Sequence, residues 1–362
     1  MNELEIARKI ISECDKEIAA LFEKRMQASE LVASYKKAHG LSILDTAREN
    51  EVIAKNSRLI ENPQIREYYV ELLREVMRLS RDYQGRLNNG MRVAYSGVEG
   101  AFAHIASKKM FPEATFVAYP DFASAYKATE NGECDIAVLP IENSSAGDVG
   151  DVMDLMFNGT LYVNQVLDLE INHCLLANHG ANIEDIKTVI SHPQALAQCS
   201  DYIHNKGFEQ ISYKNTALAA KQVKESSRTD IGAIASDETA KIFDLEILES
   251  KINSERTNTT RFLAFSRAQN VPDETRRKMN QHFMLVFTVK NEAGALAKTI
   301  DIIGSYGFNM RNLRSRPMKE LLWSYYFFVE ADGNISGENG KNMLSELAKT
   351  CDRLKLVGIY QS

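Results

Sequence analysis

Apolar residues recur at alternating steps of three and four residues along the first part of the chain, which is the period of a helix. The stretch from residue 4 to 38 contains neither proline nor glycine, so it predicts one unbroken helix. Its apolar positions are Leu4, Ala7, Ile11, Cys14, Ile18, Leu21, Ala28, Val32 and Tyr35. Such a helix would span roughly 50 Å, longer than a small domain can cover. We therefore expect its apolar face to pack against a second copy of the chain, as an intertwined helical dimer.

Two further helices are predicted before the period changes. His39-Gly40 ends the first helix, and a second runs from about Asp45 to Glu61. Asn62-Pro63 supplies an N-cap and a proline at the first helical position of the third helix, which reaches about Arg86. The turn-prone Asn88-Asn89-Gly90 then precedes a strand-like pattern, so we place a domain boundary there.

Short apolar strands alternate with amphipathic helices from residue 91 to 268. This alternation predicts an α/β domain with mostly parallel strands. The pattern falls into two blocks, the second starting near Leu167, so we expect two lobes with a cleft between them. The polar stretch from Arg267 to Lys278, which contains Pro272, is predicted to be a linker.

The last part of the chain, residues 282 to 362, predicts strand, helix, strand, strand, helix and strand in that order. This is the order of a ferredoxin-like α+β domain, βαββαβ. The sequence as a whole therefore indicates a multidomain protein with an all-α, an α/β and an α+β part.

Composition and charge narrow the class of protein. The chain has 362 residues, of which 44% are hydrophobic and 25% charged, as in ordinary globular proteins of two to three domains. Its net charge of −6 disfavours a nucleic-acid partner. The N-terminus lacks an apolar core of a signal peptide, and no apolar run is long enough to span a membrane. The 5 cysteines form no metal-binding spacing, so we expect reduced thiols in the cytoplasm, with no metal and no cofactor.

Charged residues occupy positions of the three helices where an apolar residue is expected. Arg25 stands on the apolar face between Leu21 and Ala28, where a guanidinium is costly unless an anion pairs with it. Lys36 lies on nearly the same face of the helix. For any one of these residues, internal salt bridges would be a sufficient explanation.

Taken together, residues 1–88 resemble the all-helical chorismate mutases. The resemblance rests on polar residues at nearly unbroken spacing: Arg8, Arg25, Lys36, Asp45, Arg48, Glu49, Ser80 and Gln84. It implies a rearrangement of chorismate that needs no nucleophile, only a folded substrate and stabilisation of charge at the ether oxygen. By the same resemblance, Lys36 and Gln84 donate to that oxygen, and the partner's Arg8 helps to hold the carboxylates. The other implied substrate-binding residues are Arg25, Arg48, Asp45, Glu49 and Ser80.

Residues 91–268 resemble the prephenate dehydratases. The matching motifs are PIENSSAG at 140–147, NHCLL at 172–176, SHPQ at 191–194 and TRF at 260–262. The resemblance implies a two-lobed, periplasmic-binding-protein-like fold in which Thr260 hydrogen-bonds the departing hydroxyl of prephenate. It places these residues along the cleft between the lobes: Asn143, Ser191, Gln198, Thr260 and Arg261.

This chain departs from the usual dehydratase pattern after the first strand. The family commonly has Gly-Pro-x-Gly-(Thr/Ser)-(Phe/Tyr)-Ser, whereas two of the hydroxyl positions are Ala101 and Ala103 here. If those hydroxyls normally donate to substrate, the dehydratase affinity or rate is reduced.

Residues 282–362 resemble the small-molecule-binding ACT domains. The matching residues are Gly294, Ala295 and Leu296 at a helix start, and Arg314, Ser315, Arg316 and Pro317 at a strand end. The resemblance implies a phenylalanine pocket at a dimer interface. Glutamate is usual where Arg314 stands, so we expect an inverted charge near the effector. A purely structural dimerisation domain is the alternative.

The leading hypothesis is a bifunctional chorismate mutase/prephenate dehydratase with phenylalanine feedback, acting as a homodimer or homotetramer. The alternatives are a non-catalytic metabolite sensor and a mutase with an impaired dehydratase domain. A solute-binding protein outside the cytoplasm would need a signal peptide. A DNA-binding regulator is disfavoured by the length of the first helix and the balanced charges of residues 1–90.

Overall fold

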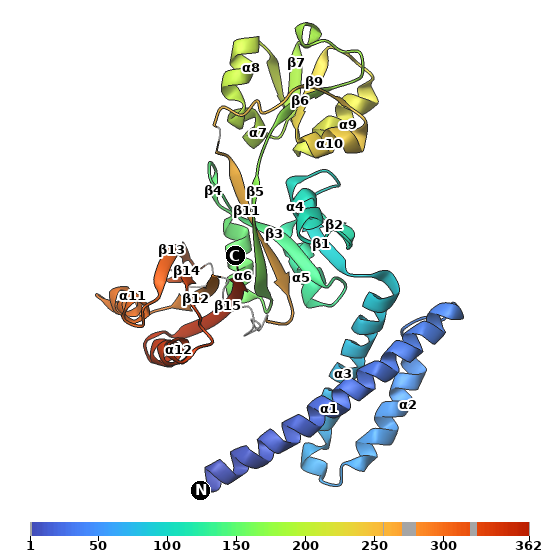
Figure 1. The fold of residues 1–362 in the computed structure, drawn as a ribbon, viewed down its shortest axis with the longest axis vertical. Helices are drawn as coiled ribbons and strands as arrows, with labels where there is room; N and C mark the ends of the chain where they lie inside the picture. The colour runs from blue at the N-terminus through green and yellow to red at the C-terminus, as the bar shows by residue number, and fades with distance from the viewer. Residues whose placement is uncertain (1, 256, 270–279, 319–323, 362) are drawn as a thin grey trace. The chain divides into compact units, whose positions relative to one another are not determined.

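The computed structural model describes residues 2–255, 257–269, 280–318 and 324–361. The chain divides into two compact units, Met1–Met91 and Arg92–Ser362. Figure 1 traces both units from the blue N-terminus to the red C-terminus. The predicted linker falls mostly on 270–279, outside the described residues.

The first unit consists of three helices (Figure 1): α1 (Glu3–Ala38), α2 (Thr46–Asn56) and α3 (Pro63–Asn89). The single long first helix is confirmed, and a capping box between Asn2 and Glu5 starts it. The second helix is shorter than predicted because the chain tightens into a 3₁₀ turn at Ser57–Leu59. Gly90, with a positive φ of 74°, ends α3.

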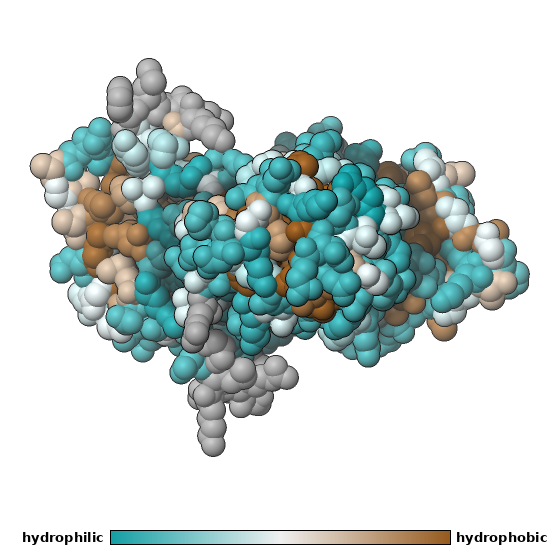
Figure 2. Space-filling view, turned by 90° about the horizontal axis from the view of Figure 1, so that it is seen from above, coloured by the Kyte–Doolittle hydropathy of each residue, from teal (hydrophilic) through white to brown (hydrophobic). Residues whose placement is uncertain are grey.

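Large apolar side chains remain exposed on the helices of this unit. Only Ser29 and Ala33 are buried among the residues of α1. The exposed residues on α1 include Leu4, Ile10, Ile11, Ile18, Leu21, Leu31 and Tyr35. Figure 2 shows one face of the molecule as a whole, on which apolar patches lie among polar side chains. The apolar face of α1 is therefore exposed to solvent in a single chain.

The second unit begins with a lobe built on one sheet. In chain order its elements are β1 (Arg92–Ser96), α4 (Phe102–Met110), β2 (Thr115–Tyr119), α5 (Phe122–Glu130), β3 (Ile136–Asn143), β4 (Gly147–Asp148), α6 (Gly150–Asn158) and β5 (Tyr162–Glu170). The strand β11 (Thr259–Ser266) joins this sheet on its return from the second lobe, giving the order β5-β11-β3-β1-β2. The long strands β5 and β11 run between the lobes (Figure 1).

The second lobe has its own sheet, in the order β10-β6-β9-β7-β8. Its elements are β6 (Cys174–Ala177), η2 (Ile183–Asp185), β7 (Thr188–Ser191), α7 (Pro193–Gln198), α8 (Ser200–Lys206), β8 (Glu209–Ser212), α9 (Thr216–Ser226), β9 (Ile231–Ala235), α10 (Asp237–Phe243) and β10 (Glu246–Glu249). The two predicted lobes are therefore present.

Both sheets are mixed, so the prediction of mostly parallel strands was only partly right. In the first lobe β1 is parallel to β2 and β3, whereas β11 is antiparallel to β3 and β5. The reason is topological: the chain leaves this lobe along β5 and returns along β11, and neighbouring outward and returning strands must run in opposite directions.

The C-terminal part follows the predicted βαββαβ order. Its elements are β12 (Gln281–Thr288), α11 (Ala295–Ser305), β13 (Asn309–Pro317), β14 (Tyr325–Asp332), α12 (Glu338–Thr350) and β15 (Arg353–Gln361). The strands lie in the order β13-β14-β12-β15, with antiparallel neighbours.

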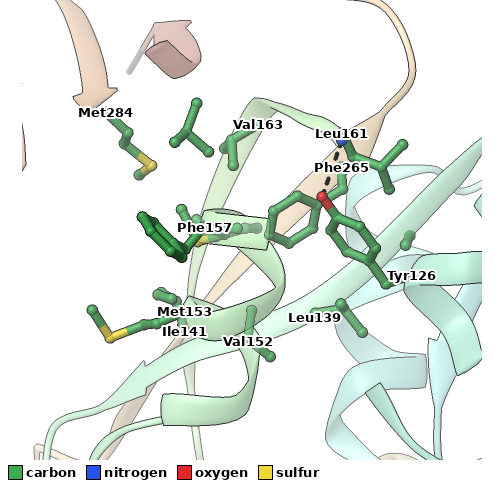
Figure 3. Packing of buried hydrophobic residues seen from close by; sticks show 14 of the residues in the cluster. Tyr126, Leu139, Ile141, Val152, Met153, Phe157, Leu161, Val163, Phe265 and Met284 are labelled. Atoms are coloured by element: carbon green, nitrogen blue, oxygen red, sulfur yellow. Dashed lines mark hydrogen bonds between the residues drawn. The ribbon is translucent and has the colours of Figure 1, made fainter. Parts of the chain in front are cut away.

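The C-terminal sheet is covered on both faces. Buried residues such as Phe283 and Leu285 belong to a core shared with α11 and α12. Met284 belongs instead to the core of the first lobe, with Met153 and Phe157 of α6 (Figure 3). Neighbouring residues of β12 thus belong to different cores, as the alternation of side chains along a strand requires.

The C-terminal sheet also joins the sheet of the first lobe edge to edge. Gly358 of β15 pairs with Val163 of β5 in parallel register. The backbones approach closely: a Cβ atom at Gly358 would lie 2.3 Å from the carbonyl oxygen of Val163. Only glycine fits at this contact, because any side chain would collide with the neighbouring backbone.

Candidate active sites

A polar cavity of about 200 Å³ lies among the three helices of the first unit. Its lining contains the polar residues that the sequence predicted, with the exception of Arg8: Arg25, Lys36, Asp45, Arg48, Glu49, Ser80 and Gln84. Arg8 is exposed near the start of α1. The structure therefore brings this set together within one chain and leaves Arg8 outside it.

Two cations of this cavity are bonded only to neutral groups. Arg25 donates to the hydroxyl of Ser80 and to the carbonyl of Val76, at 3.3 Å for the latter. Lys36 Nζ donates to the carbonyl of Ile43 at 2.6 Å. Within the described part of the chain, neither cation forms an ion pair. Burial lowers the pKa of Arg25, which is the direction expected for a cation without a compensating anion. Internal salt bridges, the alternative for a single residue, do not account for these two.

Other charged residues of the cavity have bonding partners inside the protein. Asp45 is the N-cap of α2 and accepts from the Arg48 backbone N–H at 3.0 Å, which fixes the first turn of that helix. Glu49 pairs with Arg81, a cavity residue that the sequence analysis missed. The sequence did contain a signal for Arg81. Glu49 on a polar helix face needs a cation as partner, and Arg81 directly follows Ser80, which was itself identified.

Gln84 is buried beside this cavity with an unused polar atom. Its side chain is 7% exposed, and its Oε1 has no hydrogen-bond partner among the residues described. A buried amide that lacks a partner is costly unless a ligand completes its bonding. Together with Arg25 and Lys36, it makes the cavity suited to an anionic ligand that also carries a hydrogen-bond donor such as a hydroxyl group.

A second candidate site centres on two residues of neighbouring strands. Asn143 of β3 and Thr260 of β11 are register partners. The Asn143 Oδ1 accepts from the backbone N–H groups of Ser145 at 3.0 Å and Ala146 at 2.8 Å, which fixes the orientation of the amide. Its Nδ2 then donates to Thr260 Oγ1 at 2.9 Å. Because the threonine oxygen accepts this bond, its own hydroxyl proton can be donated to a ligand.

A cavity of about 510 Å³ lies next to this pair, between the lobes. Its lining combines the loop after β3 with the first helices of the second lobe and the returning segment: Ser145, Ala146, Gln194, Ala197, Gln198, Ser200, Asp201, Asn253, Ser254, Glu255 and Asn258. Asn258, which is 2% exposed, accepts from Asn143 at 2.8 Å, and its own Nδ2 lacks a partner among the described residues.

Gln198 lines this cavity, and a hydrogen bond to His173 fixes the position of its side-chain amide. His173 Nε2 lies 2.9 Å from Gln198 Oε1. Burial lowers the pKa of His173, so the ring is neutral and donates from Nε2. This bond leaves the N–H groups of Gln198 available to a ligand. His173 lies in the NHCLL motif, so the sequence indicated the segment but not this role.

Only Gln198 of the residues expected along the cleft lines this cavity. Asn143 and Thr260 lie behind its wall, where Asn143 bonds to Asn258, and the other two expected residues lie elsewhere. The hydroxyl of Ser191 donates to the carbonyl of Ile234 at 2.5 Å and is fully buried within the second lobe. Arg261 forms a bidentate pair with Asp168, at 2.8 and 3.1 Å, and a second pair with Glu330 of β14 at 3.0 Å. Hydrogen bonds to Asp168 raise the pKa of Arg261. Side chains alternate along a strand, so Arg261 faces away from the cleft when Thr260 faces Asn143.

The positions that lack the family's hydroxyls lie at the start of α4. Ala101 is the N-cap of that helix and makes no side-chain capping bond. Ala103 is buried in its first turn. The first alanine therefore leaves a helix N-terminus without the cap that serine or threonine would provide.

The segments expected to hold an effector lie at the same end of the C-terminal sheet. The loop that contains Gly294 follows Thr288, the last residue of β12. Thr288 and Arg316 of β13 are both register partners of Tyr326 on β14, so they lie at the same end of the sheet. Gly294 has a φ of 84° and begins α11.

Arg314 does not have the surroundings that the sequence suggested. Its guanidinium pairs with Glu142 at 2.5 Å and with Asp148 at 2.6 Å, both in the first lobe. The charge at this position is thus neutralised by carboxylates of the first lobe.

No helix in the described chain is long and apolar enough to cross a membrane. In the same residues, no three His, Cys, Asp or Glu side chains are grouped so as to hold a metal ion.

Comparison with known proteins matches both parts of the chain in which the candidate sites lie. A family model described as chorismate mutase type II matches residues 7–85, and one described as prephenate dehydratase matches residues 93–270. A bifunctional chorismate mutase/prephenate dehydratase of Neisseria gonorrhoeae is 31% identical over 98% of this chain and 95% of its own. An Arabidopsis thaliana arogenate dehydratase/prephenate dehydratase is 32% identical over 90% of this chain and 88% of its own.

A solved structure extends the similarity to the fold. It is a prephenate dehydratase from Arthrobacter aurescens in complex with L-Phe, with a TM-score of 0.69 and 26% identity. The similarity covers 75% of this chain and 90% of that one.

Proposed function

The chain belongs to the bifunctional chorismate mutases/prephenate dehydratases, and we propose that its two cavities are the sites of these successive reactions of phenylalanine biosynthesis. The helical unit rearranges chorismate to prephenate, and the cleft of the second unit converts prephenate to phenylpyruvate. The observation that carries the proposal is the pair of cations Arg25 and Lys36, which line the helical cavity without an ion pair in the described chain.

The mutase reaction fits the chemistry of the helical cavity. Chorismate is a dicarboxylate, so Arg25, Arg48 and the partner's Arg8 hold its carboxylates and select the folded conformer. Lys36 and Gln84 donate to the ether oxygen as its bond to carbon breaks and negative charge develops there. Donors fixed in place before the reaction stabilise this charge without reorganisation.

The dehydratase reaction needs a donor at one end of the substrate ring. The bond to the carboxylate breaks, its electron pair enters the ring as CO₂ leaves, and the opposite hydroxyl departs with a proton as water. Thr260 donates a hydrogen bond to that departing oxygen, and Asn143 holds the threonine oxygen from behind. Gln198 and Asn258 present amide groups to the rest of the substrate.

The C-terminal part is proposed to be an ACT domain that binds phenylalanine and regulates the dehydratase. Support comes from its βαββαβ topology and from the solved relative that contains L-Phe. We assign the mutase domain to residues 1–88, the dehydratase domain to 91–268 and the ACT domain to 282–362.

The active protein is proposed to be a homodimer or homotetramer in the cytoplasm. The exposed apolar residues of α1 support a second copy, and the exposed position of Arg8 fits a role in the partner's cavity. The five cysteines are all free thiols, in agreement with a reducing compartment.

The test supplies chorismate, prephenate and arogenate separately to the purified protein, and measures prephenate and the aromatic product over time. We expect turnover of chorismate and prephenate. Lys36→Ala should remove the first reaction and keep the second, whereas Thr260→Ala should do the reverse. Turnover of neither chorismate nor prephenate would refute the proposal, and turnover of arogenate alone would correct the substrate of the cleft.

A further inference from the structure

The guanidinium of Arg314 bridges the two strands of a hairpin in another domain. Glu142 and Asp148 are register partners on the antiparallel pair β3 and β4. Arg314 of β13 approaches Glu142 at 2.5 Å and Asp148 at 2.6 Å, and its side chain is only 10% exposed. The contact to Asp148 is an ion pair without the geometry of a hydrogen bond. The cation therefore acts on this hairpin through charge more than through directed bonds.

The hairpin is electrostatically unfavourable without that cation. Two like charges directly opposite each other on antiparallel strands repel and destabilise the pairing. Partial burial strengthens the repulsion, because fewer water molecules screen it. A single arginine that faces both carboxylates converts this repulsion into attraction.

The next register pair of the same hairpin includes a residue of the proposed cleft. Asn143 follows Glu142 on β3 and pairs with Gly147 of β4. Its amide bonds to the backbone of Ser145 and Ala146, inside the hairpin turn, and to Thr260. Any opening of the hairpin would therefore turn the amide that orients the threonine hydroxyl.

A second contact ties the neighbouring strand to the same domain. Arg261 follows Thr260 on β11, pairs in register with Glu142, and contacts Glu330 of β14 at 3.0 Å. Glu330 is 2% exposed and also accepts from Tyr360. Glu142 precedes Asn143 and Arg261 follows Thr260, and each forms an ion pair with a residue of the C-terminal domain.

We propose that Arg314 is a positioning residue of the dehydratase site, which neutralises Glu142 and Asp148 and thereby holds Asn143 against Thr260. The proposal rests on the function assigned above, and it adds a route by which the C-terminal domain acts on the cleft. A shift of β13 withdraws the cation, the hairpin loosens, and the donor geometry at Thr260 is lost.

The first test removes the charge. Arg314→Gln should lower the dehydratase kcat by about tenfold to a hundredfold, since a misplaced catalytic group costs this much. Prephenate KM should change less than kcat, and Arg314→Lys should retain most of the rate because it keeps the cation. The mutase rate of the same chains should not change, and urea unfolding of the second unit shows whether the altered unit is folded. Arg311→Gln is the matched control, because Arg311 lies on the same strand and pairs with Asp332 of its own domain.

The second test asks whether the effect is charge repulsion. Adding Glu142→Gln and Asp148→Asn to Arg314→Gln removes both carboxylates, and the dehydratase kcat should recover to within a few-fold of the unaltered protein. Salt should also raise the kcat of Arg314→Gln alone, because it screens the repulsion.

An Arg314→Gln chain with unchanged dehydratase kcat would overturn the proposal, as would failure of the neutral triple variant to recover while urea unfolding shows that its second unit is folded. These outcomes are distinct from failure of the proposed function, in which the unaltered protein itself does not consume prephenate.

Discussion

Asn143 and Thr260 face each other across two antiparallel strands, and the amide of the first donates to the hydroxyl oxygen of the second at 2.9 Å. The direction of this bond sets the direction of the next one. Because Asn143 is the donor, the threonine proton is available to a group in the cleft.

Reversing that bond should impair the dehydratase. In Asn143→Asp the carboxylate can only accept, so it draws the Thr260 proton away from the substrate. We expect the dehydratase kcat to fall by about a hundredfold, similar to loss of one preorganised donor. The mutase rate should not change. A dehydratase kcat close to that of the unaltered protein would show that the Asn143 donor is dispensable.

The helical unit should be active only as a dimer with shared sites. Arg8→Ala and Arg25→Ala chains should each lose mutase activity alone. When they are unfolded together and refolded as a mixture, each mixed dimer should contain one cavity with both arginines. We expect about a quarter of the unaltered activity, because half of the dimers are mixed and each has one intact site. No recovery would place Arg8 outside the partner's cavity.

The missing cap of α4 offers a stabilising substitution. Ala101→Ser should place a hydroxyl that accepts from the backbone N–H groups of the first turn, and add about 0.5–2 kcal/mol to the free energy of unfolding of the second unit. Urea unfolding measures it. Ala103→Ser is the control: it places a hydroxyl at a buried position of the same turn, where it cannot cap, so no gain is expected. Equal gains in both variants would rule out capping as the cause.

Lys355 should give the second unit a pH-dependent stability. Its ammonium group donates to the carbonyls of Met156 and Gly159, and burial lowers its pKa from 10.5 to about 8. Between these values the unfolded chain binds more protons than the folded one, so stability rises with pH. The contribution is complete above pH 10.5 and is lost as the pH falls through about 8.

The expected rise is about 1–2 kcal/mol, because partial exposure reduces the effect of the shift. Urea unfolding at pH 7.5 and 10 measures it. The Lys355→Met variant should lack the rise, whereas Lys349→Met, at an exposed position of α12, should keep it. A rise that survives in Lys355→Met would assign the pH dependence to another group.

The sequence predicted the parts of the fold that local pattern controls. The uninterrupted apolar period predicted the bounds of α1 to within one residue, and Asn62-Pro63 marked the start of α3. The βαββαβ order followed from alternating strand and helix periods. Arg25 and Lys36 were identified because charges on an apolar face need an explanation, whereas the other polar residues of the helical cavity were identified through the resemblance to the chorismate mutases.

Contacts between domains could not be read from the sequence. Alternation along β11 shows that Thr260 and Arg261 face opposite sides, but it does not show which side is the cleft. Arg314 was placed near an effector because its neighbours resemble a motif, whereas its partners Glu142 and Asp148 lie far away in sequence. The same limit applies to Ser191, whose hydroxyl is used within its own lobe by the carbonyl of Ile234.

The contact between Gly358 and Val163 restricts how this protein can be recombined with its relatives. A transplanted C-terminal domain with any side chain at the position of Gly358 would collide with a backbone carbonyl of the host and push the two sheets apart. Chimeras that exchange regulatory domains would then keep each part folded and lose the communication between them. A glycine at this position is therefore a practical criterion for choosing donor domains when feedback control is to be transferred from one enzyme to another.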